Sequence, residues 1–478
     1  MVAQSYEFYI NTTRFLQLRQ KRNLHLESFM NHSERMGSLP ISKLLLQQSL
    51  PAAIGILMLS INMVVDSIYV GNFIGSIALG AIAVVLPITF FISALGMSIG
   101  VGGASIISRA LGAKNKEKAF QTFGNQTILT LGLSIFVVLI STFFIEDILN
   151  IWGGKGELLA PAKEYFMTLL PGVPFLAWAM MSNNVFRAEG LPKIAMVSML
   201  IPAFINLTLD PIFIIYLDMG LHGAALATTI AYICSGTFAF SYFLFGQSSM
   251  SVNPTYLKPS LEIINEITRV GGVTFVRQGA VSILAIVLNN SLFYYGSELA
   301  VSSYGIISRL MMVINFPIFG LTQGFIPIAG FNYGSKQWPR VKEVLYTAIK
   351  YGLGIAVVIF AVLTIFAPQI VGLFSNDSNL IDQTYPALRI VFLLTPTLIV
   401  QLLSSAYYQA IGKALPALIL TLLKQGIFLI PLVIILPLYF GLDGIWYSFP
   451  IADGLTTIVS AIFIRKSMQR LIPQGSPT

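Results

Sequence analysis

Long apolar runs of about 20 residues recur along almost the whole chain, and short polar segments separate them. A helix of about 20 apolar residues crosses a hydrocarbon core of about 30 Å, and in lipid an open chain satisfies its backbone hydrogen bonds only as a helix. The pattern therefore predicts twelve membrane-spanning helices, numbered as spans 1 to 12, at about 46–70, 77–108, 121–145, 162–186, 194–216, 221–245, 270–295, 300–331, 344–368, 384–410, 416–438 and 443–464.

The composition indicates the same class. The chain is 55% hydrophobic and 10% charged, with a mean hydropathy of +0.79, whereas soluble domains carry about 25% charged residues. The single cysteine, Cys234, lies in an apolar run and does not reveal the compartment. The net charge of +8 would suit nucleic acid, but the basic residues are scattered in short loops. We therefore expect the lipid bilayer, and no nucleic acid, as the large partner.

Basic residues occupy alternate loops, and acidic residues dominate the loops between them. The basic positions cluster at 109–118, 187–193, 258–269, 336–342, 413 and 465–470, with Lys155, Lys163 and Arg389 as exceptions. By the positive-inside rule both termini lie in the cytoplasm, which requires an even number of spans. The chain is thus predicted to be a multi-pass protein of the cytoplasmic membrane.

An internal repeat divides the chain into halves. Shifted by 222 residues, RALGAKNK at 109–116 lies on FNYGSKQW at 331–338, and RAEG at 187–190 lies on QAIG at 409–412. Six spans return a chain to the same side, so the repeat is parallel. The predicted fold is all-α, with two six-helix lobes around a central cavity, as is common among transporters. The expected parts are a disordered basic tail at 1–42, an N-terminal lobe at 43–248, a cytoplasmic linker at 249–269, a C-terminal lobe at 270–468 and a tail at 469–478.

Two carboxylates interrupt the apolar spans of the first half. A charged residue at the centre of a span costs roughly 2.5–3.5 kcal/mol on insertion scales and marks a functional site by default. The shift of 222 places Asp66 on Leu288 and Asp210 on Leu432. The second half therefore does not copy these acids.

Polar neighbours accompany both acids. Asn62 precedes Asp66 by four residues, and Asn206 precedes Asp210 by four, so each pair shares one helix face. The direction of the spans places Thr228 at a similar depth, and the proline after Asp210 frees a backbone carbonyl. These groups predict a site for a proton or a hard monovalent cation. The alternative is that both acids lie at water-filled helix ends and are only solvated.

Other charges in the spans favour structural roles. Arg277 and Lys424 lie near cytoplasmic ends, where long side chains reach water. Arg309 lies deeper in span 8 and requires a partner, for which Asp453 is the candidate. A structural ion pair and a cavity-lining role are both open for these two residues. No substrate-binding residue is identified.

Several segments resemble the MATE (multidrug and toxic compound extrusion) family of efflux transporters. They include VVDSIYVG at 64–71, FRAEGLPKIAMVSMLIPAFINLTLDPIFI at 186–214, GLHGAALAT at 220–228 and YGIISRLMMVINFPIFGLTQGFIPIAGFNYG at 304–334. The resemblance covers about residues 40–468 and implies two six-helix lobes with cytoplasmic termini. It is to the branch whose coupling site lies in the N-terminal lobe, which implies coupling roles for Asp66, Asn206, Asp210, Thr228 and Tyr165.

Two further points concern that resemblance. Asn183 matches the family by spacing, although its expected depth is near the cytoplasmic end of span 4. The acids typical of the C-terminal lobe in the other branch are missing, and Asn289 and Asn290 occupy their region of span 7.

The expected function is export of small organic, amphipathic cationic compounds by alternating access, in exchange for a coupling ion. The chain has no Walker glycine loop and no metal-binding spacing among its three histidines, so we expect neither an enzyme nor a cofactor. A flippase for lipid-linked saccharides and a passive channel are the alternatives. We favour the proton as the coupling ion, while sodium at Asp66, Asn206, Asp210 and Thr228 stays open. We expect a monomer.

Overall fold

The computed structural model describes residues 32–246, 248–250, 253–374 and 377–471. The regular structure of these residues is helical, and twelve of the helical segments are long and apolar enough to cross a membrane. They coincide with the twelve predicted spans, so the predicted helical class and span number are confirmed. The largest shift at a helix start is at span 7, which begins at Leu261 rather than near residue 270.

The N-terminal lobe contains the first six spans. Its helices are α2 (Ile41–Phe73), α3 (Ser76–Gly112), α4 (Lys116–Phe143), α5 (Ile145–Ile151), α6 (Leu159–Leu169), α7 (Val173–Ala188), α8 (Pro192–Pro211) and α9 (Gly220–Phe245). Span 4 consists of the short helix η1 (Gly156–Leu158), α6, η2 (Leu170–Gly172) and α7, and span 5 consists of α8 and the π-helix η3 (Ile212–Tyr216).

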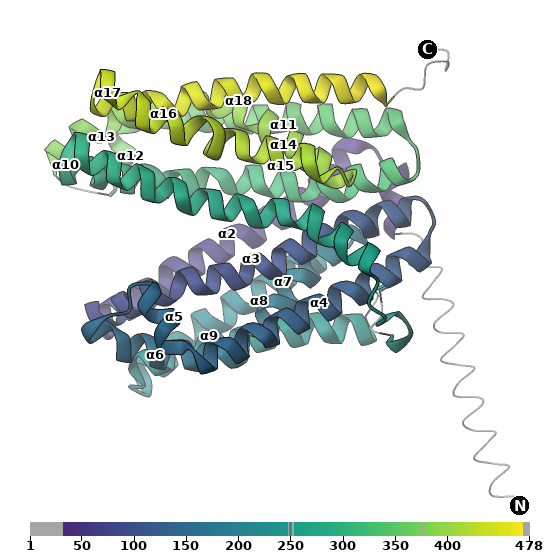
Figure 1. Cartoon of the computed structure of the whole chain (residues 1–478), viewed down its shortest axis with the longest axis horizontal. Coiled ribbons are helices and arrows are strands. Elements are labelled where there is room, and N and C mark those ends of the chain that lie inside the picture. Colours follow the sequence, from purple (N-terminus) through teal and green to yellow (C-terminus); the bar gives the residue numbers. More distant parts are fainter. Residues whose placement is uncertain (1–31, 247, 251–252, 375–376, 472–478) are drawn as a thin grey trace, which may run out of the picture.

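The C-terminal lobe contains the other six spans. Its elements are α10 (Leu261–Gly334), α11 (Trp338–Ile365), α12 (Ala367–Gly372), α13 (Ser378–Val391), η5 (Thr395–Thr397), α14 (Leu398–Ala410), α15 (Ala414–Leu422), the π-helix η6 (Leu423–Leu429), α16 (Ile430–Ile435), α17 (Pro437–Phe440) and α18 (Leu442–Arg470). In Figure 1 the two lobes converge at the end where α18 finishes and α2 begins, and they diverge toward the opposite end.

The helix α10 is continuous over Leu261–Gly334, although it contains both span 7 and span 8. Both of its ends lie against α3. A Cβ atom on Gly102 would meet the carbonyl oxygen of Ile267 at 2.2 Å, and one on Gly112 would meet that of Phe331 at 2.0 Å. The helix therefore leaves this end of the molecule and returns to it, reversing where the two spans meet, near Gly296.

The lobes are held together closely at their convergent end. Since a side chain at Gly112 would collide with the backbone of span 8, glycine is required for this approach. Ser105 donates its hydroxyl to the carbonyl of Gln409 across the lobes at 2.5 Å. Arg109 of α3 forms an ion pair of 2.7 Å with Glu266 of α10. Because the first turns of α10 pack on α3, this ion pair fastens the start of span 7 to the N-terminal lobe. The contact between the lobes at this end consists of the backbone packing at Gly112 and the hydrogen bond of Ser105.

Ordered structure begins closer to the N-terminus than the sequence analysis predicted. Residues 32–38 form a helical segment, and α2 begins at Ile41. Met36 is 1% exposed, and its carbonyl accepts a hydrogen bond from the amide of Asn332 at 2.9 Å. Arg340 donates to the carbonyl of Leu39 at 2.7 Å. The prediction of a disordered tail through residue 42 is wrong for residues 32–42, because their carbonyls are held by the C-terminal lobe. Residues 1–31 lie outside the described residues.

The inter-lobe linker is shorter than predicted, because α10 begins at Leu261 and not near residue 270. Its first part is held by Glu189, whose carboxylate accepts hydrogen bonds from the hydroxyls of Ser248 and Ser249 and from the backbone N–H of Met250, at 2.8–3.0 Å. Burial raises the pKa of the Glu189 carboxyl to about 7, while these donors act to lower it.

The second part of the linker is held by α4. The side chain of Asn125 accepts a hydrogen bond from the backbone N–H of Ser260 at 2.8 Å and donates one to the carbonyl of Lys258 at 3.2 Å. Both ends of the linker are therefore attached to the N-terminal lobe.

Candidate cation site

Two helices of the N-terminal lobe supply the centre of the site. Asn206 and Asp210 lie one turn apart on α8, and Thr228 faces them from α9. The amide nitrogen of Asn206 donates to Asp210 Oδ1 at 3.2 Å and to Thr228 Oγ1 at 3.1 Å. Asn206 is 3% exposed and Asp210 is fully buried. Asn206 thus fixes the carboxylate of one helix relative to the hydroxyl of the next.

Asp66 completes an acid pair from a third helix, α2. Its carboxyl group lies against that of Asp210, close enough for a hydrogen bond when one of the two holds a proton. Two carboxylates at this distance repel each other strongly if both are ionised, so one positive charge or one proton between them is favoured. The predicted common depth of Asp66, Asp210 and Thr228 agrees with this arrangement.

Two tyrosines border the pair. Tyr165 on α6 is 6% exposed, and its hydroxyl lies within hydrogen-bonding reach of Thr228. Tyr232 on α9 lies close to Asp66 and was missed in the sequence analysis. Its signal was present, because it follows Thr228 by four residues and so shares its helix face. The site is therefore lined by groups from four helices.

Four side-chain oxygens in this group are buried without a hydrogen-bond donor. They are Asn62 Oδ1, Asp66 Oδ1, Asn206 Oδ1 and Asp210 Oδ2. Leaving a buried acceptor unsatisfied costs about 1–3 kcal/mol, and more for a charged group. Neither acid forms an ion pair with a basic side chain among the residues that the structure describes. Oxygen-only ligands with unbalanced negative charge suit a proton or a hard cation, since soft metals prefer sulfur.

The backbone beside Asp210 is irregular. Helix α8 ends at Pro211 and continues as the π-helix η3. Proline has no N–H, so the carbonyl of Leu207 loses its usual helical partner. Single π-helical turns within longer helices occur frequently at functional sites. The fully buried acid therefore stands where the helix changes its winding.

Asn183 does not join this group. Its amide donates to the carbonyl of Ala195 at 2.5 Å and to the hydroxyl of Ser198 at 3.0 Å. Ala195 precedes Asp210 by 15 residues, which is about 22 Å along a helix. Asn183 instead ties α7 to the beginning of α8.

The predicted partnership of Arg309 and Asp453 is wrong. Asp453 on α18 forms an ion pair of 2.6 Å with Lys424, whose side chain is 19% exposed. Lys424 lies in η6, the π-helical segment that packs against α18. Asp453 is therefore paired with Lys424 instead of Arg309.

The corresponding region of the C-terminal lobe is apolar. Leu288, the counterpart of Asp66, is fully buried in the hydrophobic core of that lobe, and Leu432, the counterpart of Asp210, packs against the same core. The acid pair thus belongs to one lobe, as the repeat predicted.

Comparison with known proteins agrees with this architecture. The MatE family profile matches residues 51–212 and again residues 274–435, so the two matches begin 223 residues apart. The chain is 32% identical over 437 residues to the multidrug export protein MepA of Staphylococcus aureus (strain MRSA252), covering 90% of this chain and 95% of that protein. It is 31% identical over 431 residues to the MepA protein of Staphylococcus saprophyticus, covering 88% and 93%.

A solved structure extends the similarity to three dimensions. An outward-facing conformation of a multidrug resistance MATE family transporter superimposes with a TM-score of 0.87 at 27% identity, covering 92% of this chain and 98% of that one.

Proposed function

Because the chain belongs to the MATE family, we propose that it exports organic, amphipathic cationic compounds across the cytoplasmic membrane in exchange for a cation bound in its N-terminal lobe. The observation that carries this proposal is the pair of the partly buried Asp66 and the fully buried Asp210, which has several unsatisfied oxygens around it and no counterpart in the other lobe. The similarity to multidrug export proteins named MepA supports the substrate class.

The proposed mechanism is alternating access in which the coupling cation and the drug compete for binding. A cation held between the two acids neutralises them, and its release restores a negative charge that favours a cationic drug in the space between the lobes. Cation and drug then disfavour each other's binding, which is the coupling that an antiporter requires. The closed end contains the short basic loops, so the positive-inside rule orients it toward the cytoplasm. The structure then corresponds to an outward-facing state, in agreement with the similar transporter structure.

The proton is the proposed coupling ion. One proton shared by Asp66 and Asp210 satisfies both carboxyl groups without a fixed coordination shell. The site also has a hydroxyl and two amides that could complete a sodium shell, so the test must separate the two ions. Binding of sodium would require several of these oxygens to converge on one point.

The decisive experiment is efflux of ethidium from proteoliposomes under a proton gradient or a sodium gradient, each imposed alone. We expect the proton gradient to drive export by the wild-type protein. Asp66→Asn and Asp210→Asn should each abolish gradient-driven export at normal expression, because an amide cannot cycle a proton and binds a cation more weakly. The matched control is Asp218→Asn, an exposed acid of the same lobe with φ of 47°, a conformation that asparagine adopts readily.

Three outcomes would contradict parts of this proposal. Export driven by sodium alone would replace the proton as the coupling ion. Full export by both variants would remove the site. No export of ethidium or of other cationic drugs under either gradient would remove the substrate class and favour a flippase for lipid-linked saccharides.

A further inference from the structure

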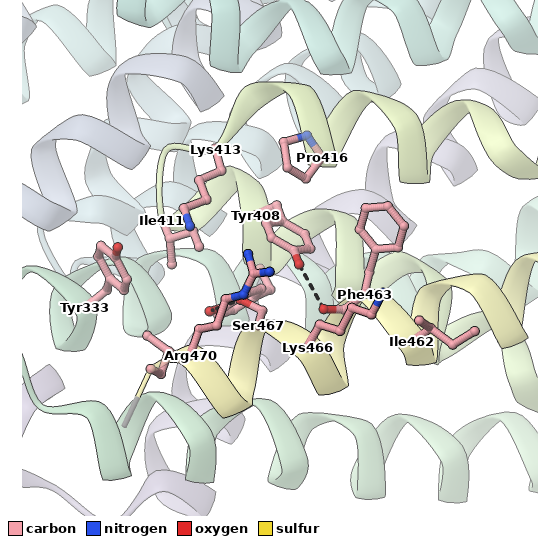
Figure 2. A pocket seen from close by; sticks show the side chains of 12 residues that line it. Tyr333, Tyr408, Ile411, Lys413, Pro416, Ile462, Phe463, Lys466, Ser467 and Arg470 are labelled. Carbon is pink, nitrogen blue, oxygen red and sulfur yellow. Dashed lines mark hydrogen bonds between the residues drawn. The ribbon is translucent and has the colours of Figure 1, made fainter. Parts of the chain in front are cut away.

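A cavity of about 360 Å³ opens in the C-terminal lobe at the end where the two lobes converge. It lies between α14, α18 and the turn that precedes α15. Three exposed basic residues, Lys413, Lys466 and Arg470, contribute to its lining. Figure 2 shows the guanidinium of Arg470 beside Tyr408 and the charged end of Lys413 beside Ile411. The cavity therefore concentrates positive charge at one point of the membrane boundary.

These cations have no carboxylate to balance them. Within the described ranges, none of Lys413, Lys466 and Arg470 has an acidic side chain within 4.0 Å. Like charges gathered around one hollow repel one another and raise the local concentration of anions. An anion bound between them would relieve that repulsion.

Hydroxyl groups form the inner wall of the cavity. The hydroxyl of Tyr408 donates to the carbonyl of Phe463 at 3.0 Å, and the hydroxyls of Tyr407 and Ser467 are 3.1 Å apart. The oxygens of a phosphodiester only accept hydrogen bonds, so the donor in this wall is the free proton of the Tyr407–Ser467 pair, which either hydroxyl can turn toward a ligand while it accepts from the other. The wall can therefore add a hydrogen bond to an oxygen-rich headgroup.

An apolar surface continues from the cavity along the lobe. Pro416, Ile462 and Phe463 line the cavity on this side. Ile458 and Ile462, which are 60% and 47% exposed, lie one turn apart on α18, and Leu415 of α15 is 67% exposed. In a membrane-spanning bundle such exposed aliphatic side chains face hydrocarbon. The ligand that fits both surfaces is an amphiphile, with an anionic head and aliphatic chains.

The N-terminal lobe has no equivalent feature at the positions related by the repeat. The shift of 222 places Ile411 on Glu189, and the shift of 221 that relates GLHG at 220–223 to GLDG at 441–444 places Arg470 on Ser249, next to Ser248. In that lobe Ser248 donates its hydroxyl to the carboxylate of Glu189, which is 3% exposed. A buried acid covered by linker residues thus stands where the C-terminal lobe has an open cavity with cations. The cavity is therefore a feature of one lobe and not a consequence of the shared fold.

We propose that this cavity binds the phosphate headgroup of an anionic phospholipid, with the acyl chains lying along the exposed aliphatic side chains of α15 and α18. Basic pockets between membrane helices on the cytoplasmic side are suited to such headgroups. With the orientation given under Proposed function, the cavity faces the inner leaflet of the membrane. This placement rests on the proposed function, but lipid binding itself does not depend on transport.

The test measures binding of soluble short-chain lipids to the purified full-length protein in neutral detergent, by titration calorimetry at low salt. We expect dihexanoyl-phosphatidylglycerol to bind and dihexanoyl-phosphatidylcholine to bind at least tenfold more weakly. The triple variant Lys413→Gln/Lys466→Gln/Arg470→Gln should lose affinity by about fivefold for each charge removed. Lys466→Arg should bind like the wild type, because it keeps the charge.

A second triple variant, Lys116→Gln/Lys193→Gln/Lys342→Gln, controls for net charge, since these residues do not line the cavity. It should retain at least half of the wild-type affinity. The proposal is overturned if both triple variants lose affinity equally, if phosphatidylcholine binds as tightly as phosphatidylglycerol, or if inorganic phosphate binds as tightly as the anionic lipid. The last result would assign the cavity to a free anion.

Discussion

The carboxyl groups of Asp66 and Asp210 lie against each other although they come from α2 and α8, and Asn206 holds the second acid from one turn away. The amide nitrogen of Asn206 uses one donor for Asp210 and the other for Thr228, and its buried oxygen has no hydrogen-bond partner.

The first prediction separates Asn206 from Asn183, two buried asparagines of the same lobe. Asn206→Ala should reduce gradient-driven export at least tenfold while the folded yield stays normal, because it removes the bridge between Asp210 and Thr228. Asn183→Ala should instead lower the free energy of unfolding by about 1–3 kcal/mol, since it leaves the carbonyl of Ala195 and the hydroxyl of Ser198 without that donor.

Export per folded molecule and thermal unfolding of both proteins provide the measurement. Equal loss of export in the two variants would contradict the assignment of only one of them to the site.

The second prediction concerns the ion pair between Lys424 and Asp453. Asp453→Asn should destabilise the protein by about 2–4 kcal/mol, because it leaves a largely buried ammonium group without its partner. The double variant Lys424→Met/Asp453→Leu should recover most of that loss and keep export near the wild-type level. Thermal unfolding and ethidium efflux measure the two effects. A double variant that is stable but inactive would show that the pair takes part in transport.

The third prediction concerns the closed end. Gly112→Ala places a Cβ atom 2.0 Å from the carbonyl oxygen of Phe331, so the lobes must separate there. We expect slower export and a longer distance between spin labels at residues 114 and 336, in a background with Cys234 replaced. Gly132→Ala is the matched control, because no atom lies within 4 Å of its added Cβ. An unchanged label distance in the Gly112 variant would contradict the assigned packing.

The fourth prediction is a pH dependence that arises from Glu189. Burial raises the pKa of its carboxyl to about 7 from an ordinary value of 4.5. The folded protein therefore holds this proton more tightly than the unfolded chain does. The resulting stabilisation is complete below about pH 4.5 and is lost as the pH rises through 7, to a total on the order of 3 kcal/mol.

Glu189→Gln should abolish this dependence, which is measured as the difference between the melting temperatures of wild type and variant from pH 5 to pH 8. The variant keeps an acceptor for the donors of the linker, so it remains a fair comparison. A difference that does not change over this range would contradict the assignment.

Much of the fold and of the candidate site could be predicted from the sequence, for physical reasons. The twelve spans could be predicted because a membrane-spanning helix needs about 20 apolar residues. The spacing of four residues put Asn206 and Asp210 on one face, and the structure places them there. The pairing of Lys424 with Asp453 was not predictable, because the π-helical segment that contains Lys424 leaves no signature in residue type. The order in residues 32–42 was missed because it comes from the distant residues Asn332 and Arg340.

The attachment of the linker at both ends has a mechanical consequence. Glu189 holds Met250, and Asn125 holds Ser260. The beginning of α10 is also part of the N-terminal lobe, because a Cβ atom on Gly271 would lie 2.1 Å from the carbonyl oxygen of Ser98. The described parts of the segment that joins the lobes in sequence are therefore fastened to the N-terminal lobe. In the alternating access proposed above, the bend between the lobes is then expected in the part of α10 beyond Gly271, where Gly279 has open space beside it.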